Sequence, residues 1–352
     1  MYVNLTPQST GGSLLTGARA YARWKWLAGG LAVLFLITYP LLNGQDAFGL
    51  NLLTETLIFA LFALSLDLLL GYTGLVSFGH ATYFGLGAYS AGILTAQLKN
   101  SNFLLGLLMG VLVAGLGALV LGFFSIRTSG IYFLMLTLAF SQMCYALAFK
   151  WNDVTGGSNG LPVPKPEFSL VGWQLDLGDG TVFYFVVLTC FLAGFFGLRQ
   201  VVHSPFGRTL IGIRDNEKRL AALGYQTSNF KLMACVIAGA LGGLAGALNA
   251  YHNGFVSANE FYWTTSGLVM VMVLLGGKGS LIGAVLGAFF VRYAEQFIQG
   301  QQTAKLGTFV VSERWQMVLG LIFILCVLLA PGGLVGLWQS LVRQVTRRLE
   351  WR

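Results

Sequence analysis

Long apolar runs separated by short polar breaks cover most of the chain. A helix of about 20 apolar residues crosses the roughly 30 Å hydrocarbon core of a bilayer. The run TSGLVMVMVLLG at 265–276 is too short to cross unless it forms a half-helix or joins its neighbour. The pattern predicts an all-α polytopic membrane protein with about ten transmembrane helices, or with eight or nine. We expect these helices near residues 25–42, 50–70, 74–98, 103–125, 130–149, 182–198, 231–251, 265–276, 280–299 and 314–330.

The composition agrees with a membrane protein and narrows its chemistry. Of the 352 residues, 56% are hydrophobic and only 10% are charged, which is too few to cover a water-facing surface. The net charge of +8 indicates basic cytoplasmic loops rather than a nucleic-acid surface. The four cysteines lie inside apolar runs without metal-ligand or redox spacing, so we interpret them as buried small hydrophobes.

Lysines and arginines are distributed unevenly between the two sides of the expected helices. If the N-terminus is cytoplasmic, 15 of the 21 fall in segments on that side and 5 on the other. The positive-inside rule then predicts that both termini face the cytoplasm. We expect a cytoplasmic tail at 1–24, a transmembrane domain at 25–337 and a basic cytoplasmic tail at 338–352.

Two loops are long enough to carry contacts outside the membrane. Residues 151–181 are polar, rich in glycine and proline, and fall outside, whereas residues 199–231 fall inside. The inner loop predicts an amphipathic helix that starts at Pro205 and ends at Gly224. Its apolar positions are Leu210, Ile213, Leu220 and Leu223. Such a helix either lies on anionic lipid headgroups or docks a cytosolic partner.

Few ionisable side chains fall inside the expected helices. Arg292 and Glu295 are three residues apart, so we expect them to pair on one helix face. Glu55 and Asp67 lie near opposite ends of one helix, where a headgroup or a backbone amide is within reach. These four groups favour structural pairing over a proton relay.

Motifs for catalysis are missing from the sequence. The segment GGKGS at 276–280 lacks the glycine spacing of a phosphate-binding loop. No G-x-S-x-G or H-E-x-x-H pattern occurs either. The chain is therefore predicted not to be an enzyme, and we expect no cofactor and no metal site.

The stretch GLVSFGHATYFGLGAYSAG at 74–92 contains more glycine than a lipid-exposed helix needs. Glycine allows two backbones to approach closely, and the same spacing recurs as G-x-x-x-G elsewhere. Tight packing inside the chain is our preferred interpretation of these pairs. The stretch also predicts a helix that is broken or bent in the membrane, with 265–276 as a candidate counterpart.

Several blocks of the sequence resemble the permease subunits of branched-chain amino acid ABC importers, the LivM type. They include GYTGLVSFGHATYFGLGAYSAG at 71–92, VTGGSNGL at 154–161, SPFGRTLIGIRDNEKRLAALG at 204–224 and VMVLLGGKGSLIGAVLGA at 271–288. The blocks follow the family's order over residues 50–337. The resemblance implies the ABC importer permease fold and a subunit that forms the path for branched-chain or related amino acids.

The resemblance also implies partners and a location. They are a second homologous permease, two cytosolic ATPase subunits that hydrolyse the ATP, and a periplasmic solute-binding protein, all at the bacterial inner membrane. Alternatives are the same role for urea, amides or aromatic acids, or a self-sufficient ion-coupled carrier. The loop at 199–231 becomes the ATPase-coupling loop, and the loop at 151–181 becomes periplasmic.

Three groups of residues are candidates for these roles. The coupling group is Pro205, Gly207, Arg208, Arg214, Asn216, Glu217, Leu220, Leu223 and Gly224. A pathway or packing group is Ser77, Gly79, His80, Gly85 and Gly87. A binding-protein contact group is Thr155, Gly156, Gly157, Ser158 and Asn159. We interpret His80 as a neutral imidazole bonded to backbone exposed by the glycine-rich bend, with gating or ligand contact as the alternative.

Overall fold

The computed structural model describes most of the chain between residues 30 and 337. The described residues are 30–31, 33–40, 42, 46–98, 102–166, 168–170, 173–175, 177–300, 305–306, 309–310, 315–329 and 332–337. They divide into two compact units, residues 1–50 and residues 51–352. In the first unit, Tyr39 Oη donates a hydrogen bond to Asp46 Oδ2 at 3.2 Å. All that follows concerns the second unit.

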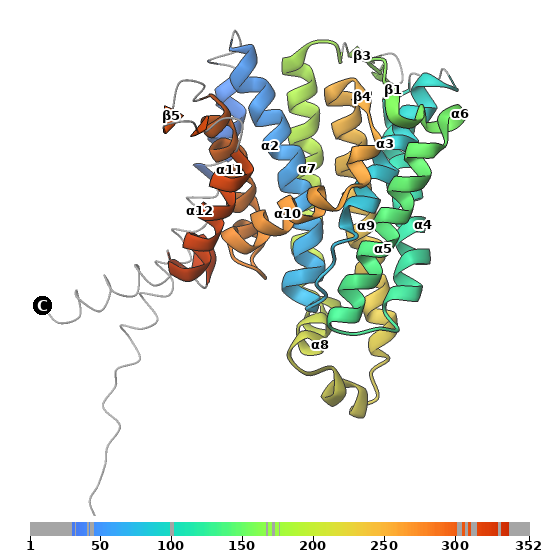
Figure 1. The fold of residues 1–352 in the computed structure, drawn as a ribbon, viewed down its shortest axis with the longest axis vertical. Helices are drawn as coiled ribbons and strands as arrows, with labels where there is room; N and C mark the ends of the chain where they lie inside the picture. Colours follow the sequence, from blue (N-terminus) through green and yellow to red (C-terminus); the bar gives the residue numbers. More distant parts are fainter. Residues whose placement is uncertain are drawn as a thin grey trace, which may run out of the picture. The chain divides into compact units, whose positions relative to one another are not determined.

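Helices form nearly all of this unit (Figure 1). The long helices are α2 (Ala47–Asp67), α3 (His80–Ala96), α4 (Phe103–Ser125), α5 (Ile131–Lys150), α7 (Gly180–His203), α8 (Pro205–Ala222), α9 (Thr227–Asn253), α10 (Trp263–Gly276), α11 (Leu281–Gly300) and α12 (Trp315–Leu329). Shorter helical elements are the π-helix η1 (Leu68–Thr73), α6 (Asn152–Thr155), η2 (Gly157–Asn159) and η3 (Ala258–Phe261).

Short strands occur only in the connections between helices of the described chain. They pair antiparallel as β1 (Leu161–Pro162) with β4 (Phe255–Val256), β2 (Phe168–Leu170) with β3 (Trp173–Leu175), and β5 (Lys305–Leu306) with β6 (Phe309–Val310). The prediction of an all-α polytopic protein is thus confirmed, since these strands are two or three residues long.

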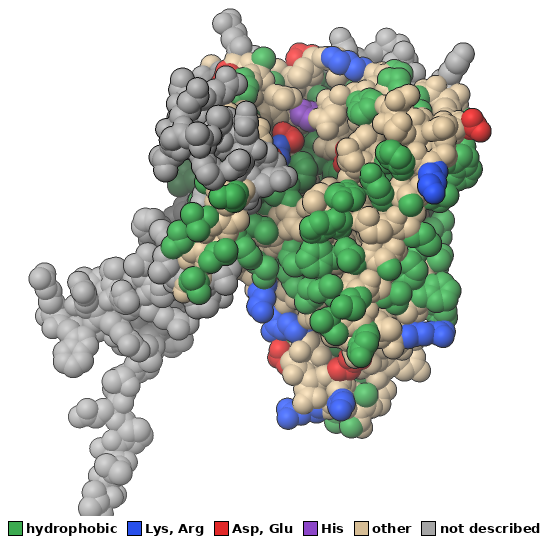
Figure 2. Space-filling model, viewed as in Figure 1, with side chains coloured by type: hydrophobic (Ala, Val, Ile, Leu, Met, Phe, Trp, Pro, Cys, Tyr) green, Lys and Arg blue, Asp and Glu red, His purple; other side chains and the backbone are tan. Residues whose placement is uncertain are grey.

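Within the described residues, six helices are long and apolar enough to cross a membrane. They are Ala47–Thr73, Phe103–Ser125, Ile131–Lys150, Gly180–His203, Thr227–Asn253 and Leu281–Gly300. Hydrophobic side chains cover the sides of these helices, and Lys and Arg gather toward the α8 end (Figure 2). The total of ten spans stays a prediction, and the expected span at 25–42 lies partly outside the described residues.

Helices α3, α4 and α9 pack against one another without large side chains between them. A Cβ atom at Gly87 of α3 would collide with the backbone of Gly243 in α9. A Cβ at Gly243 would in turn collide with Ala114 in α4. The prediction that the glycines serve close packing inside the chain is therefore confirmed.

Two helices start part-way along the membrane domain, namely α3 and α10 (Figure 1). The expected helix at 74–98 is wrong in its first residues, because Gly74 takes a left-handed conformation with φ +78° and helix α3 begins only at His80. The backbone N–H of Ala81 donates to Ser266 Oγ at 2.8 Å, which joins the start of α3 to α10. The predicted break in the glycine-rich stretch thus lies before His80.

Candidate functional site

Helix α8 has the boundaries that its sequence predicts. Pro205 occupies the first turn, and Ser204 Oγ accepts a hydrogen bond from the Gly207 N–H at 3.4 Å. A side chain at Gly207 would collide with the carbonyl of Val202 at the end of α7, so glycine permits the tight corner. Gly224 follows the helix with φ +89°, the left-handed conformation expected at a helix end.

The prediction of one continuous amphipathic helix is wrong at Asn216. This residue has φ −162° and ψ 92°, so α8 is kinked into two parts. Asn216 Oδ1 accepts from the Arg219 N–H at 3.0 Å and caps the second part. The second part folds back so that Leu220 lies over Gly212 of the first.

The kink divides the apolar positions of α8 into two sets. Leu210 and Ile213 are buried within the chain, at 0% and 4% exposure. Leu223 is 70% exposed, and Tyr225 beyond it is 48% exposed. The end of α8 therefore presents apolar surface that the described chain does not cover.

Arg214 connects α8 to the rest of the unit through a backbone atom. Its Nη1 donates to the Gly71 carbonyl at 2.7 Å, within the π-helix η1. π-Helical turns are rare and are frequent at functional sites. Nearby, Asp67 Oδ1 accepts from the Gly279 N–H at 2.7 Å, in the turn between α10 and α11. We call Asp67, Gly71, Arg214 and Gly279 the junction, because they join α8, the end of α2 and that turn.

A second connection anchors the part of α8 beyond the kink. Glu217 Oε1 lies 2.5 Å from Lys231 Nζ and accepts from Thr227 Oγ1 at 3.1 Å. Lys231 is buried at 5% exposure, so the pair is shielded on the α9 side. The carboxylate of Glu217 is thus engaged within the chain, whereas Arg208 on the first part of α8 is exposed.

His80 is fully buried at the start of α3. Its Nε2 lies 2.7 Å from Ser65 Oγ, and its ring stacks on Phe62 with centroids 5.1 Å apart. The interpretation that His80 bonds exposed backbone is therefore wrong, since its partner is a serine hydroxyl on α2. No sequence spacing indicates this contact, because Ser65 and His80 lie on different helices.

The other residues of the pathway or packing group make packing contacts. Ser77 Oγ accepts from the Gly79 N–H at 3.2 Å and supports the non-helical segment before α3. Gly85 faces the ring of Phe261, which would meet any Cβ there at 2.5 Å. Like Gly87, these positions hold helices together, and lining of a pathway by them stays a prediction.

The segment Thr155–Asn159 lies at the end of the bundle opposite α8 (Figure 1). Thr155 is buried, and its Oγ1 donates to the carbonyls of Ala148 and Trp151, each at 2.6 Å. Gly156 and Gly157 turn the chain with φ of 71° and 58°. Ser158 and Asn159 are exposed, so only the tip of the segment is available to a partner.

A short strand pair connects this segment to the start of α10. Leu161 in β1 is opposite Val256 in β4, and the Val163 N–H donates to the Gly254 carbonyl at 2.8 Å. Strand β4 leads through η3 into α10. The tip at 158–159 is thus attached to the chain that leads into the shorter helix.

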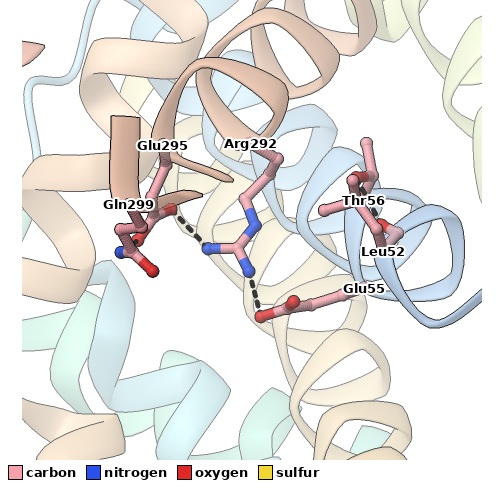
Figure 3. A network of polar contacts seen from close by, with 6 residues as sticks. All are labelled: Leu52, Glu55, Thr56, Arg292, Glu295 and Gln299. Carbon is pink, nitrogen blue, oxygen red and sulfur yellow. Dashed lines mark hydrogen bonds and ion pairs between the residues drawn. The ribbon is translucent and has the colours of Figure 1, made fainter. Parts of the chain in front are cut away.

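Charged side chains from two helices meet in the half of the domain away from α8 (Figure 3). Arg292 on α11 forms an ion pair with Glu55 on α2 and donates from Nη1 to Glu295 Oε2 at 2.6 Å. Gln299 Nε2 donates to the other oxygen of Glu295 at 3.3 Å. The expected Arg292–Glu295 pair is confirmed, but the expectation of a headgroup or amide partner for Glu55 is wrong. Opposite charges in two apolar helices could have indicated this pair.

Comparison with known proteins identifies the family. Residues 49–328 match the family model described as a branched-chain amino acid transport system permease component. The chain belongs to this permease family. It is 27% identical over 319 residues to the high-affinity branched-chain amino acid permease protein LivM of Salmonella typhimurium, covering 85% of this chain and 72% of that protein.

Other relatives extend the range of solutes within the family. The LivM protein of Escherichia coli is 29% identical over 309 residues, covering 81% of this chain and 69% of that protein. The autoinducer 2 import permease LsrC of Salmonella paratyphi B is 27% identical over 283 residues, covering 74% of this chain and 75% of that protein. No solved structure matches the chain. The family and the six apolar helices together show a multi-pass membrane permease.

Proposed function

We propose that this chain is the membrane subunit of an ATP-driven importer for branched-chain or related amino acids, and that α8 docks one of two separate ATPase subunits. The observation that carries the docking proposal is the exposed apolar end of α8, around Leu223, on a helix otherwise fixed to the domain. Membership of the permease family supports the importer role over a self-sufficient ion-coupled carrier. LsrC keeps the identity of the solute open.

The junction supports transmission of movement from α8 into the membrane. A rigid start at Pro205 and the Arg214 bond to Gly71 couple α8 to α2, and Asp67 couples α2 to the turn before α11. A displacement of α8 by an ATPase would therefore reach two membrane helices through hydrogen bonds to backbone. This route needs no ionisable relay within the chain.

On the other side of the membrane, a solute-binding protein is the expected partner. The exposed tip at Ser158 and Asn159 suits a docking contact, because β1 and β4 connect it to the start of α10. Under the same proposal the complex includes a second homologous permease, and the α8 end with both termini faces the cytoplasm of a bacterial inner membrane. The gathering of Lys and Arg toward the α8 end supports that orientation (Figure 2).

The docking proposal is tested by placing a charge at the exposed leucine. In Leu223→Asp the apolar contact is lost and a carboxylate is desolvated on docking, at a cost of about 2 kcal/mol or more. The complex should then lose its ATPases during purification while still retaining the second permease. Leu98→Asp is the matched control, because Leu98 is 69% exposed near the other end of the domain and should keep the ATPases.

Retention of both ATPases by Leu223→Asp, together with normal import, would contradict docking through α8. The lipid-surface interpretation of this helix would then be preferred. Uptake by the purified chain without any ATPase would instead support the ion-coupled carrier.

A further inference from the structure

The charged side chains of Figure 3 are more numerous than a simple structural pair requires. Arg292 is shared by Glu55 and Glu295, so these three groups alone carry one excess negative charge when ionised. Charges inside a membrane are costly, and they mark substrate pathways when they persist. A single ion pair would bind the helices together equally well without the third group.

The position of the cluster suits a solute that enters from the side away from α8. Glu55 lies eight residues after the start of α2, and Arg292 lies eight residues before the end of α11. At 1.5 Å per residue, each is about 12 Å from its helix end. The cluster is thus inside the membrane domain but nearer to the end where the 158–159 tip lies.

Arg292 is held in a fixed plane and keeps donor capacity. Its guanidinium carbon lies 4.8 Å from the ring centroid of Phe59, and Nη1 and Nη2 bind the two glutamates. Its Nε has no hydrogen-bond partner although it is buried. A guanidinium with a free N–H in a fixed orientation is suited to bind a carboxylate.

The cluster is not sealed from solvent. The side chain of Glu55 is 26% exposed, and those of Arg292 and Glu295 are 12% and 13% exposed. His252 at the end of α9 lies within electrostatic range of Glu55 and Arg292, and Glu260 in η3 lies within range of Glu55. Figure 2 shows acidic, basic and histidine side chains together in a recess of this face.

We propose that Glu55, Arg292 and Glu295 form a recognition site for the zwitterionic backbone of an amino acid during its passage through the membrane. Arg292 binds the α-carboxylate, and Glu55, with Glu260 beside it, binds the α-ammonium group. The incoming solute exchanges with the internal ion pairs, so affinity is low and release is easy. This inference rests on the proposed function and adds to it where the solute is bound in the permease.

The site is tested on the assembled complex without its binding protein, in lipid nanodiscs. Binding of L-leucine, of 3-methylbutylamine and of 4-methylpentanoate is compared by saturation-transfer NMR. The amine lacks the carboxylate and the acid lacks the ammonium group, so each should bind about tenfold more weakly or worse. Equal binding of all three probes, or no binding of L-leucine, would overturn the proposal.

A variant separates recognition from structural support. The set Glu55→Gln, Arg292→Gln and Glu295→Gln removes all three charges but retains polar side chains, and should abolish the L-leucine signal. The matched control, Lys150→Gln with Asp153→Asn, removes one exposed charge of each sign at the same end of the domain and should retain it. If the neutral set binds L-leucine as the natural chain does, the proposal is wrong.

Two further readouts keep the outcomes distinct. If the neutral set does not fold, the comparison of the three probes on the natural chain still decides the proposal. Stimulation of ATP hydrolysis by the loaded binding protein tests the proposed function separately. If the natural complex shows that stimulation but does not bind L-leucine, only the recognition site fails.

Discussion

The two ends of the membrane domain hold their charged side chains in different ways. At the junction, Asp67 and Arg214 each bind a backbone atom of another segment, at 2.7 Å in both cases. In the opposite half, Glu55, Arg292 and Glu295 bind one another through flexible side chains. Backbone partners fix the relative position of segments, whereas side-chain partners can be exchanged for a ligand. The first arrangement suits transmission of movement and the second suits transient recognition.

The packing around the two sites differs in the same direction. At the junction, a Cβ on Gly71 would collide with the backbone of Gly279, so no space remains between the segments. Around Arg292, the paired glutamates retain partial exposure, and a recess lies on this face (Figure 2). A substitution should therefore disturb folding and coupling at the junction, but solute handling in the other half.

The largest expected effect comes from filling the contact at the junction. Gly71→Val places a branched side chain against the Gly279 backbone, which cannot be relieved by a rotamer change. We expect a loss of about 3 kcal/mol and a melting temperature lower by roughly 5 °C or more in the purified protein. Gly197→Val is the control, because Gly197 is an exposed helical glycine and a Cβ added there would meet nothing within 4 Å. Equal melting temperatures for the two variants would contradict close packing at the junction.

A smaller effect should follow from removing the Arg214 bond. Arg214→Met leaves Gly71 without this donor, and because the side chain of Arg214 is 38% exposed, we expect a loss of only about 1 kcal/mol. ATPases should still copurify, but solute moved per ATP hydrolysed should fall about fivefold. Arg214→Lys should not restore it, because an ammonium group lacks the planar donors. Lys218→Met, also on α8, removes a charge away from the junction and serves as control. Unchanged coupling in Arg214→Met would show that α8 acts by another route.

The smallest effect on stability is expected at the exposed tip away from α8. A cysteine in place of Ser158 should change stability by no more than about 0.5 kcal/mol. A crosslinker attached there should nonetheless capture the solute-loaded binding protein. No capture from several exposed positions across 155–165 would argue against docking at this tip.

The fold was predictable where local patterns determine it. Apolar runs predicted the long helices, Pro205 and Gly224 predicted the ends of α8, and clustered glycines predicted close helix contacts. Each of these features depends on residues that are near one another in the sequence. The prediction for the Arg292–Glu295 pair succeeded for the same reason.

The parts that failed depend on contacts between distant residues. The Arg214 bond to Gly71 spans 143 positions, and the Asp67 bond to Gly279 spans 212, so neither has a sequence spacing. The kink at Asn216 occurs in a segment whose apolar pattern continues through it. The π-helix at Leu68–Thr73 likewise keeps an ordinary apolar pattern. Helical periodicity does not detect such interruptions.

The most direct test of ATP-driven import through α8 is photocrosslinking from position 223. A photoreactive amino acid replaces Leu223 in the assembled complex in its native membrane, and the adducts are identified by mass spectrometry. The account predicts an adduct with an ATPase subunit, which should be absent when the same group replaces Leu98. Adducts with lipid alone from position 223, in a complex that still imports solute, would contradict the account.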